Sequence, residues 1–290
     1  MSLMIKLNAE DFKPVKQCPW CENERKEYVY NSLFDSTVYK CKECGLLYSD
    51  KILNKSGLEK YWSNYSSQVH TIDASKNYMR LKMYEIEYNF IRQFIEPQSK
   101  VLDVGCGEGG FLQLFKEDGY RTFGVEYGIE AADYSRKMGH EIFVGELPDL
   151  VIEEKFDLII FRGTIQYLID PKKYFETAIE LLSENGLIYI TSSPNSESIC
   201  SQLFKEKFVL PVTPLDYYMF SERILTNYFE NNHMHKLAEK YFYEETPYRK
   251  KDDIKILKQQ IERSGKGLHP LTISPAWYDN MLSVVYIKCI

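Results

Sequence analysis

Short apolar runs alternate with amphipathic stretches along most of this chain. Runs of the length expected for buried strands begin near residues 101, 122, 141, 156 and 187. Between them, apolar residues recur with helical spacing near residues 111, 130 and 172. This alternation predicts an α/β fold in which helices cover both faces of a mostly parallel sheet.

The segments on either side of this alternation predict further elements. A long helix is expected around residues 75–95, with a core stripe formed by Leu81, Tyr84, Tyr88, Ile91 and Ile95. Residues 195–220 have the pattern of an insertion after the fifth strand, and Ser221 is expected to cap a helix. Residues 236–243 and 283–289 predict two more strands, which brings the sheet to seven.

A glycine-rich turn follows the first of these strands. Val101 to Gly110 reads V-L-D-V-G-C-G-E-G-G, a buried strand that ends in a turn with few side chains. The glycine spacing also satisfies the dinucleotide fingerprint. Asp103 argues against a dinucleotide, because a carboxylate just before the turn repels a pyrophosphate and attracts a cationic ligand. The turn therefore favours S-adenosyl-L-methionine, which carries a sulfonium and an ammonium group.

Polar residues at the ends of the next strands agree with that choice. Glu126 ends the second strand, where a carboxylate can accept hydrogen bonds from both ribose hydroxyls. Gly145-Glu146-Leu147 follows the third strand, in a position to border an adenine. The fourth strand leads into Arg162-Gly163-Thr164.

These motifs resemble those of the class I S-adenosylmethionine-dependent methyltransferases, from about residue 75 to the C-terminus. The resemblance implies a Rossmann-like, seven-stranded sheet and places the methionine moiety at Asp103, Gly105 and Gly107. Glu126 would hold the ribose, Tyr127 would pack on the adenine, and Glu146 with Leu147 would line its edge. Cys106 and Arg162 complete the predicted cofactor contacts.

Four of the seven cysteines form two pairs in the N-terminal segment. Cys18-Pro-Trp-Cys21 and Cys41-Lys-Glu-Cys44 are nineteen residues apart, which is the spacing of a Cys₄ zinc ribbon. A redox dithiol is the rival interpretation, but that motif precedes a helix in a βαβ unit. Because four protein ligands close the coordination sphere, the Zn²⁺ is expected to be structural. Cys106, Cys200 and Cys289 are expected to pack as small apolar residues.

Composition limits the class of protein. A chain of 290 residues with 44% hydrophobic content can bury a full core. No stretch approaches the roughly 18 apolar residues of a membrane span, and no secretory leader precedes the ribbon, so we expect a soluble, cytoplasmic protein. The net charge of −6 makes nucleic acid an unlikely partner.

The order of modules narrows the resemblance. We expect a zinc ribbon in residues 1–50, an aromatic linker or lid in 51–74 and a methyltransferase domain in 75–290. This arrangement is similar to bacterial methyltransferases that act on sugars in polysaccharide or nucleotide-sugar pathways. Those proteins usually carry Glu-His after the fourth strand, where this chain has Gln166-Tyr167, and often a histidine near Asp216.

These features lead to a functional hypothesis. A methyltransferase must align the acceptor behind the methyl carbon, and a hydroxyl acceptor also has to lose its proton. Asp216 and Tyr167 are the candidate catalytic residues, with Asp216 the better base. We expect O-methylation of a sugar or another small hydroxylated metabolite. The alternatives are an RNA methyltransferase whose ribbon grips nucleic acid and a non-catalytic S-adenosylmethionine-binding protein.

Overall fold

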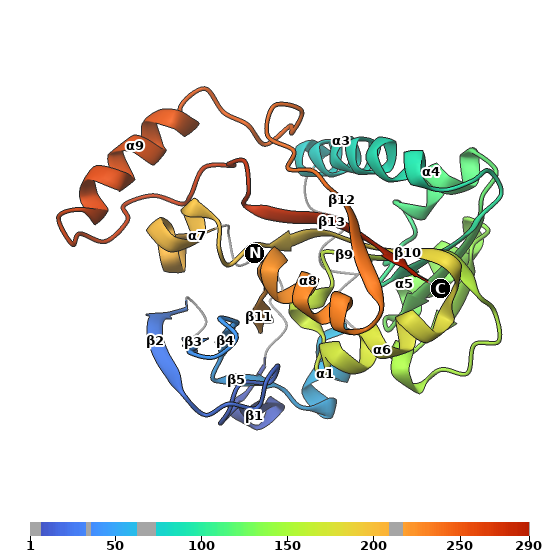
Figure 1. Cartoon of the computed structure of the whole chain (residues 1–290), viewed down its shortest axis with the longest axis horizontal. Helices are drawn as coiled ribbons and strands as arrows, with labels where there is room; N and C mark the ends of the chain where they lie inside the picture. Colours follow the sequence, from blue (N-terminus) through green and yellow to red (C-terminus); the bar gives the residue numbers. More distant parts are fainter. Residues whose placement is uncertain (1–6, 33–35, 63–73, 209–216, 290) are drawn as a thin grey trace.

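The computed structural model describes residues 7–32, 36–62, 74–208 and 217–289, and its centre is a seven-stranded sheet (Figure 1). The strand order is β12-β13-β10-β9-β6-β7-β8. Neighbouring strands from β10 to β8 pair in parallel, whereas β13 runs antiparallel to β10 and β12. The strands are β6 (Lys100–Val104), β7 (Arg121–Glu126), β8 (Glu141–Val144), β9 (Phe156–Arg162), β10 (Leu182–Pro194), β12 (Met234–Glu239) and β13 (Met281–Lys288). The predicted seven-stranded α/β sheet is confirmed.

Helices cover both faces of this sheet (Figure 1). One face packs against α3, α4 and α5, and the opposite face packs against α6 and α8. Neighbouring residues along β9 alternate between the two cores: Leu158 and Ile160 belong to the first, Ile159 and Phe161 to the second. The helices are α3 (Ala74–Ile91), α4 (Leu112–Glu117), α5 (Ile129–Lys137), α6 (Pro171–Leu181), α7 (Ile199–Phe204), α8 (Glu222–Asn231) and α9 (Asp253–Ser264).

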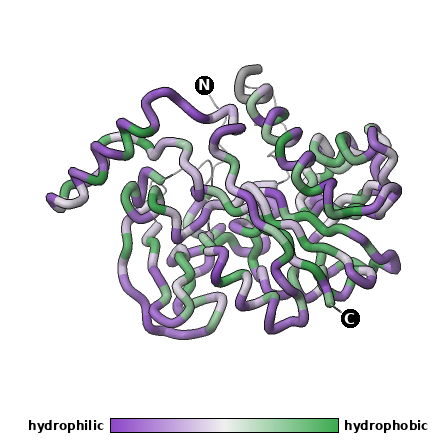
Figure 2. The backbone as a smooth tube through the Cα atoms, turned by 45° about the horizontal axis from the view of Figure 1, so that its top comes forward, coloured by the Kyte–Doolittle hydropathy of each residue, from purple (hydrophilic) through white to green (hydrophobic). Residues whose placement is uncertain are grey.

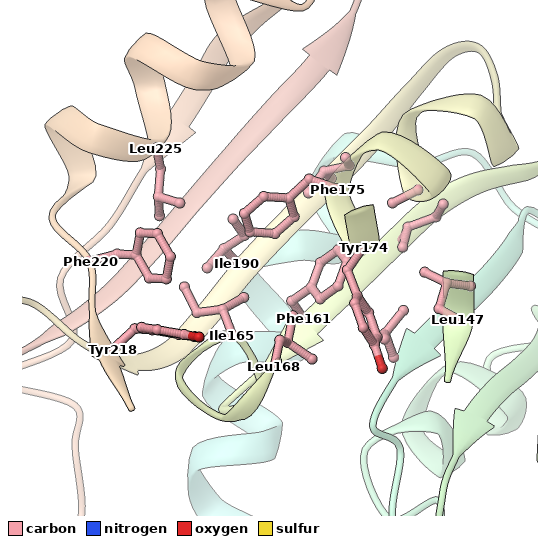
Figure 3. Close-up of a cluster of buried hydrophobic side chains, with 14 of the residues drawn as sticks. Leu147, Phe161, Ile165, Leu168, Tyr174, Phe175, Ile190, Tyr218, Phe220 and Leu225 are labelled. Carbon is pink, nitrogen blue, oxygen red and sulfur yellow. The ribbon is translucent and has the colours of Figure 1, made fainter. Parts of the chain in front are cut away.

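Aromatic rings fill the core beneath α6 and α8 (Figure 3). Phe161 on β9 points toward Phe175 on α6, with ring centroids 5.2 Å apart. Ser221 caps α8 as predicted, since its hydroxyl accepts a hydrogen bond from the amide of Ile224 at 3.3 Å. This packed layer fixes the ends of β9 and β10, from which several residues of the candidate site extend.

The N-terminal segment forms a smaller sheet that is completed by a strand from far along the chain. β2 (Lys26–Asn31), β3 (Thr37–Cys41) and β4 (Leu47–Ser49) pair in order, and β11 (Tyr218–Met219) adds a fourth strand beside β4. β1 (Phe12–Pro14) pairs with β5 (Lys51–Leu53), and α1 (Lys55–Trp62) follows. The sequence predicted a ribbon in this segment but not its partner strand at 218–219.

The ribbon is packed against the main sheet's helices rather than standing apart. Trp20, between the first two cysteines, is 7% exposed. Its ring meets Phe220 and Tyr228 with centroids 5.1 and 5.0 Å away, and Phe175 at 6.3 Å. The cysteine-bearing segment therefore shares one hydrophobic core with α6 and α8.

Residues between β12 and β13 extend away from the sheet. α9 projects from the body at the upper left of Figure 1 and contacts α7. Figure 2 shows apolar residues concentrated in the central strands, whereas hydrophilic and hydrophobic positions alternate along this arm. The described residues contain no helix long and apolar enough to cross a membrane. On α3, Tyr88 and Ile91 are buried as predicted, but the prediction for Leu81 was wrong because its side chain is 48% exposed.

Candidate functional site

A pocket of about 200 Å³ opens at the carboxyl ends of β6, β7 and β9. From β6 the chain continues to β7 on one side of it and later to β9 on the other side, so the strand order reverses at β6. Ligands usually bind at such a point in open α/β sheets. Its wall combines the glycine turn with residues of α1 and of the segments that follow β7, β8 and β9. The lining residues are Leu58, Trp62, Val104, Gly105, Gly107, Val125, Glu126, Tyr127, Ala131, Gly145, Glu146, Arg162, Gly163, Thr164, Tyr167, Leu168, Ile169 and Tyr174.

Gly105 and Gly107 have different structural roles in the turn. Gly105 (φ +80°) packs against Thr164, whose hydroxyl donates to the carbonyl of Val104 at 2.9 Å. A Cβ on Gly105 would lie 2.9 Å from that hydroxyl oxygen. Gly107 (φ +55°) borders the pocket, and a Cβ there would meet nothing within 4 Å. Gly105 therefore holds the turn against the next loop, whereas Gly107 keeps space open for a ligand.

Alanine substitutions should separate these two roles. Gly105→Ala adds steric overlap to backbone strain and should cost about 3 kcal/mol of unfolding free energy. Gly107→Ala adds strain alone, about 1 kcal/mol, but should weaken S-adenosylhomocysteine binding because the methyl group occupies the pocket. Gly267→Ala (φ +69°, no neighbour within 4 Å) is the matched control for strain. Denaturant unfolding and calorimetry measure both effects; equal loss of affinity in all three variants would contradict the assignment.

Glu126 ties the glycine turn to the end of β7. Its two carboxylate oxygens accept hydrogen bonds from the amides of Gly107 at 2.9 Å and Gly128 at 2.7 Å. Burial raises the pKa of Glu126, and these amide donors oppose that rise. The carboxylate is thus fixed at the pocket wall, where its remaining lone pairs can accept hydrogen bonds from ligand hydroxyls.

Tyr127, after β7, and Glu146, after β8, also line the pocket. The hydroxyl of Tyr174 donates to the Glu146 carboxylate at 3.4 Å. Burial raises the pKa of both Tyr127 and Glu146. An aromatic ring beside carboxylates, at the end of two neighbouring strands, suits a flat, polar-edged group such as a nucleobase.

Asp103 lies just behind the glycine turn. Its side chain is 3% exposed, and its Oδ1 atom has no hydrogen-bond partner among the described residues. Burial raises its pKa to about 7; Arg162 opposes the rise, and Glu126 and Glu87 add to it. A buried carboxylate with an unsatisfied oxygen is costly unless a ligand supplies a donor.

Glu87 is a residue of this site that sequence reasoning missed. It comes from α3, is 1% exposed, and its carboxylate accepts a hydrogen bond from Nε of Arg162 at 2.6 Å. The signal was present in the sequence, because Glu87 lies three residues after Tyr84 and four before Ile91 on the predicted core stripe. A charged residue on that stripe needs a buried partner.

Two further aromatic residues, Trp62 and Tyr167, line the pocket. The rings of Trp62 and Tyr167 lie 5.9 Å apart in an edge-to-face arrangement. Gln166 is buried beneath them and donates to the carbonyl of Gly163 at 3.0 Å. Asp216, the other candidate catalytic residue, lies outside the described residues.

The structure gathers most of the predicted cofactor contacts. Six of them line one pocket, which the candidate catalytic residue Tyr167 also lines: Gly105, Gly107, Glu126, Tyr127, Glu146 and Arg162. Three predicted contacts do not line it. Leu147 is fully buried, Asp103 lies behind the turn, and Cys106 packs in the core, where a Cβ on Gly124 would lie 2.5 Å from its sulfur.

The four ribbon cysteines occupy two turns of the same form. In each turn the first cysteine's amide donates to the carbonyl five residues later, and its carbonyl accepts from the amide four residues later, at 2.8–3.0 Å. The residue after the second cysteine has positive φ in both turns, +60° at Glu22 and +86° at Gly45. Turns of this form direct both sulfur atoms of a cysteine pair toward a single metal position.

The sulfur positions fit one tetrahedral ion. All four Sγ atoms lie within 4.8 Å of one another. The Cys18–Cys44 and Cys21–Cys41 sulfurs are 3.6 and 3.4 Å apart. Zn–S bonds of about 2.3 Å in a tetrahedron place sulfurs about 3.8 Å apart. The donor set is all-thiolate, as in structural zinc sites.

The strand order and the pocket together define the Rossmann-like class I methyltransferase fold. The model of a family described as a methyltransferase domain matches residues 77–244, so the chain belongs to that family. Magnesium protoporphyrin IX methyltransferase from Synechocystis PCC 6803, solved with bound S-adenosylhomocysteine, superposes with a TM-score of 0.55 at 10% identity. The superposition covers 81% of this chain and all of that one, and it supports the fold alone.

Curated relatives share only part of their length with this chain. A ubiquinone biosynthesis O-methyltransferase from Yersinia enterocolitica is 23% identical over 146 residues, 47% of this chain and 60% of that protein. An mRNA cap guanine-N(7) methyltransferase from Cryptococcus neoformans is 28% identical over 133 residues, 37% of this chain and 21% of that protein. The chain thus covers less than two thirds of either relative.

Proposed function

We propose that this chain is an S-adenosylmethionine-dependent methyltransferase that methylates a hydroxyl of a sugar or another small metabolite. The observation that carries the proposal is a single pocket bordered by an open glycine turn and a fixed carboxylate, Glu126. The nucleoside end of the cofactor would lie against Glu126, Tyr127 and Glu146. Its amino-acid end would lie toward Asp103, whose unsatisfied buried oxygen suits an ammonium donor.

The protein's task is to position the acceptor and exclude water. When bound, the cofactor supplies a methyl group on a sulfonium, which is already an excellent leaving group. Trp62 and Tyr167 form an aromatic wall of the pocket, a surface on which the apolar face of a sugar ring can pack. The hydroxyl proton of the acceptor still requires a base. We propose Asp216 as this base and Tyr167 as the second catalytic residue.

The cysteine cluster supports a second element of the proposal, a structural zinc ion. Cys18, Cys21, Cys41 and Cys44 would fill all four coordination positions, which leaves none for substrate. The ion would hold the two turns together and thereby position Trp20 against α6 and α8. Sugar specificity rests on the sequence resemblance and on the aromatic wall.

Calorimetry with two ligands tests the cofactor proposal. S-adenosylhomocysteine should bind at one site per chain, whereas NAD should not bind, because Asp103 repels a pyrophosphate. Absence of S-adenosylhomocysteine binding, or binding of NAD that is tighter than that of S-adenosylhomocysteine, would contradict the proposal. Release of S-adenosylhomocysteine should then be measured with nucleotide sugars and, in parallel, with RNA. Turnover with RNA alone would replace the sugar acceptor by nucleic acid.

A further inference from the structure

The segment between β12 and β13 includes a stretch whose charge is opposite to that of the rest of the chain. Residues 249–273, the basic arm, contain seven Lys and Arg residues and three Asp and Glu residues, a net charge of +4. All other positions together contain 29 basic and 39 acidic residues, a net charge of −10. α9 forms the middle of the basic arm and projects from the body in Figure 1. The basic arm can therefore approach an anionic surface that would repel the body.

The lysines of the basic arm are available to a partner. Five of them are exposed, and among the described residues none of their side chains forms an ion pair or a hydrogen bond: Lys250, Lys251, Lys255, Lys258 and Lys266. The acidic residues of the arm do little to neutralise them. Asp253 is 1% exposed, and its carboxylate accepts a hydrogen bond from the amide of Lys250 at 2.8 Å. The exposed face of the basic arm therefore has an excess of positive charge.

Exposed aliphatic side chains lie among these lysines. On α9, Ile254 and Ile261 are seven residues apart, about two helical turns, and Lys258 lies between them on the same exposed face. The opposite face is buried against α7, where Gln260 donates to the carbonyl of Leu203 at 3.0 Å. Five aliphatic side chains of the basic arm are 46–70% exposed: Ile254, Ile261, Leu268, Leu271 and Ile273. Single exposed apolar residues are ordinary, but several of them among unpaired lysines are typical of a binding surface.

Hydrogen bonds hold the tip of the basic arm in shape. The guanidinium of Arg263 donates twice to the carbonyl of His269, at 3.2 and 2.9 Å. Nζ of Lys207 donates to the carbonyls of Pro270 and Leu271 at 2.9 and 3.1 Å. The loop after α9 is thus fixed to the helix end and to the body while its aliphatic side chains stay exposed. A preformed surface loses little conformational entropy when it binds a partner.

The basic arm begins beside the wall of the pocket. Just before it, the hydroxyl of Thr246 donates to Sδ of Met83 on α3 at 3.4 Å. Burial raises the pKa of Tyr248, and the positive charges of Arg162 and Arg80 oppose that rise, so Tyr248 lies close to both. Arg162 lines the pocket. A short, packed segment therefore links the basic arm to the pocket wall.

We propose that the basic arm docks the protein on the surface of a membrane that contains anionic lipids. The lysines contact the headgroups, and Ile254, Ile261 and Leu271 enter the boundary between headgroups and acyl chains. Aliphatic side chains favour lipid over nucleic acid, because proteins that bind single strands offer aromatic rings to the bases. They also favour lipid over a soluble polyanion, which has charge but no apolar layer. This docking goes beyond the proposed methyl transfer and does not depend on it.

Flotation of the full chain with two kinds of vesicle tests the docking. Vesicles of phosphatidylcholine alone should recover little protein. An equal mixture of phosphatidylcholine and phosphatidylglycerol should recover most of it at low salt and less at high salt. Lys255→Gln combined with Lys258→Gln should weaken binding at least tenfold, because each lysine near an anionic surface contributes about fivefold.

A second double variant tests the aliphatic contacts. Ile254→Ser combined with Ile261→Ser keeps every charge and should also lose at least tenfold in vesicle binding, because the serines gain nothing from the lipid. Lys137→Gln combined with Val151→Ser changes exposed residues outside the basic arm and is the matched control. It should bind vesicles like the unmodified protein. All three variants should keep their thermal midpoint and their affinity for S-adenosylhomocysteine.

The results separate the candidate partners. Binding to the anionic vesicles that both arm variants lose supports the proposal. Binding that only the lysine variant loses, and for which heparin competes, overturns it in favour of a soluble polyanion. Absence of vesicle binding, with a dimer in light scattering that both arm variants convert to monomers, assigns the surface to a second copy of the chain. A protein that binds S-adenosylhomocysteine but no vesicle overturns the docking alone, whereas vesicle binding without S-adenosylhomocysteine binding overturns the proposed function alone.

Discussion

Cys41→Ser is expected to release one zinc ion per chain and to lower the thermal midpoint of unfolding by about 10 °C. Cys41 is buried, and its sulfur lies 3.4 Å from that of Cys21. Three remaining thiolates bind the ion more weakly, so the two turns lose the link between them. Trp20 then loses its fixed place between α6 and α8. Metal analysis and a thermal melt, with and without a chelator, measure both effects.

The same substitution should weaken cofactor binding from a distance. The ribbon is followed directly by β5 and α1, and Leu58 and Trp62 of α1 line the pocket. Tyr217, next to β11, joins the two regions: its hydroxyl accepts from the amide of Leu53 at 3.1 Å, and its amide donates to the carbonyl of Gln166 at 3.0 Å. We expect S-adenosylhomocysteine affinity to fall several-fold as the pocket loses this wall.

Cys289→Ser is the matched control, because Cys289 lies outside the cluster and is exposed, so the prediction that it packs as a small apolar residue was wrong. It should keep the metal, the thermal midpoint and the affinity. A purified protein that contains no zinc, and whose midpoint is unchanged in Cys41→Ser, would refute the metal proposal. Loss of zinc and stability with full S-adenosylhomocysteine affinity would instead refute only the coupling between ribbon and pocket.

The sequence predicted the central sheet because its strands are buried on both faces. Continuous apolar runs such as Leu158–Phe161 have little alternative to a core strand. The glycine turn was likewise predictable, since positive φ at Gly105 and Gly107 follows from a sharp strand-to-helix connection.

Contacts between distant segments were harder to predict. β11 has two residues and gains its stability from pairing with β4, about 170 residues earlier, so local pattern carries almost no signal for it. Leu81 fits the helical stripe of α3, but its side chain is exposed, because the local pattern does not show which part of the helix the sheet covers. Glu87 was overlooked because a glutamate in a helix is usually solvated; its partners Arg162 and Ser192 come from other strands.

Asp103→Asn is expected to raise stability and to impair cofactor binding. Burial raises the pKa of Asp103 from its ordinary value of 3.8 to about 7. Well below pH 3.8 the carboxyl is protonated in the folded and unfolded states and contributes nothing to the pH dependence of stability. As the pH rises toward 7, the unfolded chain releases this proton first, which favours unfolding, and the penalty is complete above pH 7. Removing the charge should therefore stabilise the fold most at pH 8.

The expected gain at pH 8 is of the order of 2 kcal/mol, because each pKa unit corresponds to about 1.4 kcal/mol and the buried amide would leave part of its polar surface unpaired. At pH 5 the gain should be distinctly smaller. S-adenosylhomocysteine affinity should fall at least tenfold, since an amide attracts an ammonium group far less than a carboxylate does.

A neighbouring aspartate provides the control for this trade-off. Asp157 on β9 accepts hydrogen bonds from the amide of Lys100 at 2.8 Å and the hydroxyl of Ser183 at 2.7 Å. Asp157→Asn should therefore lose stability and keep its affinity, the reverse of Asp103→Asn. Denaturant unfolding at pH 5 and pH 8, paired with calorimetry, separates the two. If Asp103→Asn is destabilised at pH 8, the carboxylate is satisfied within the fold, and its unsatisfied oxygen is no longer evidence for a cationic ligand.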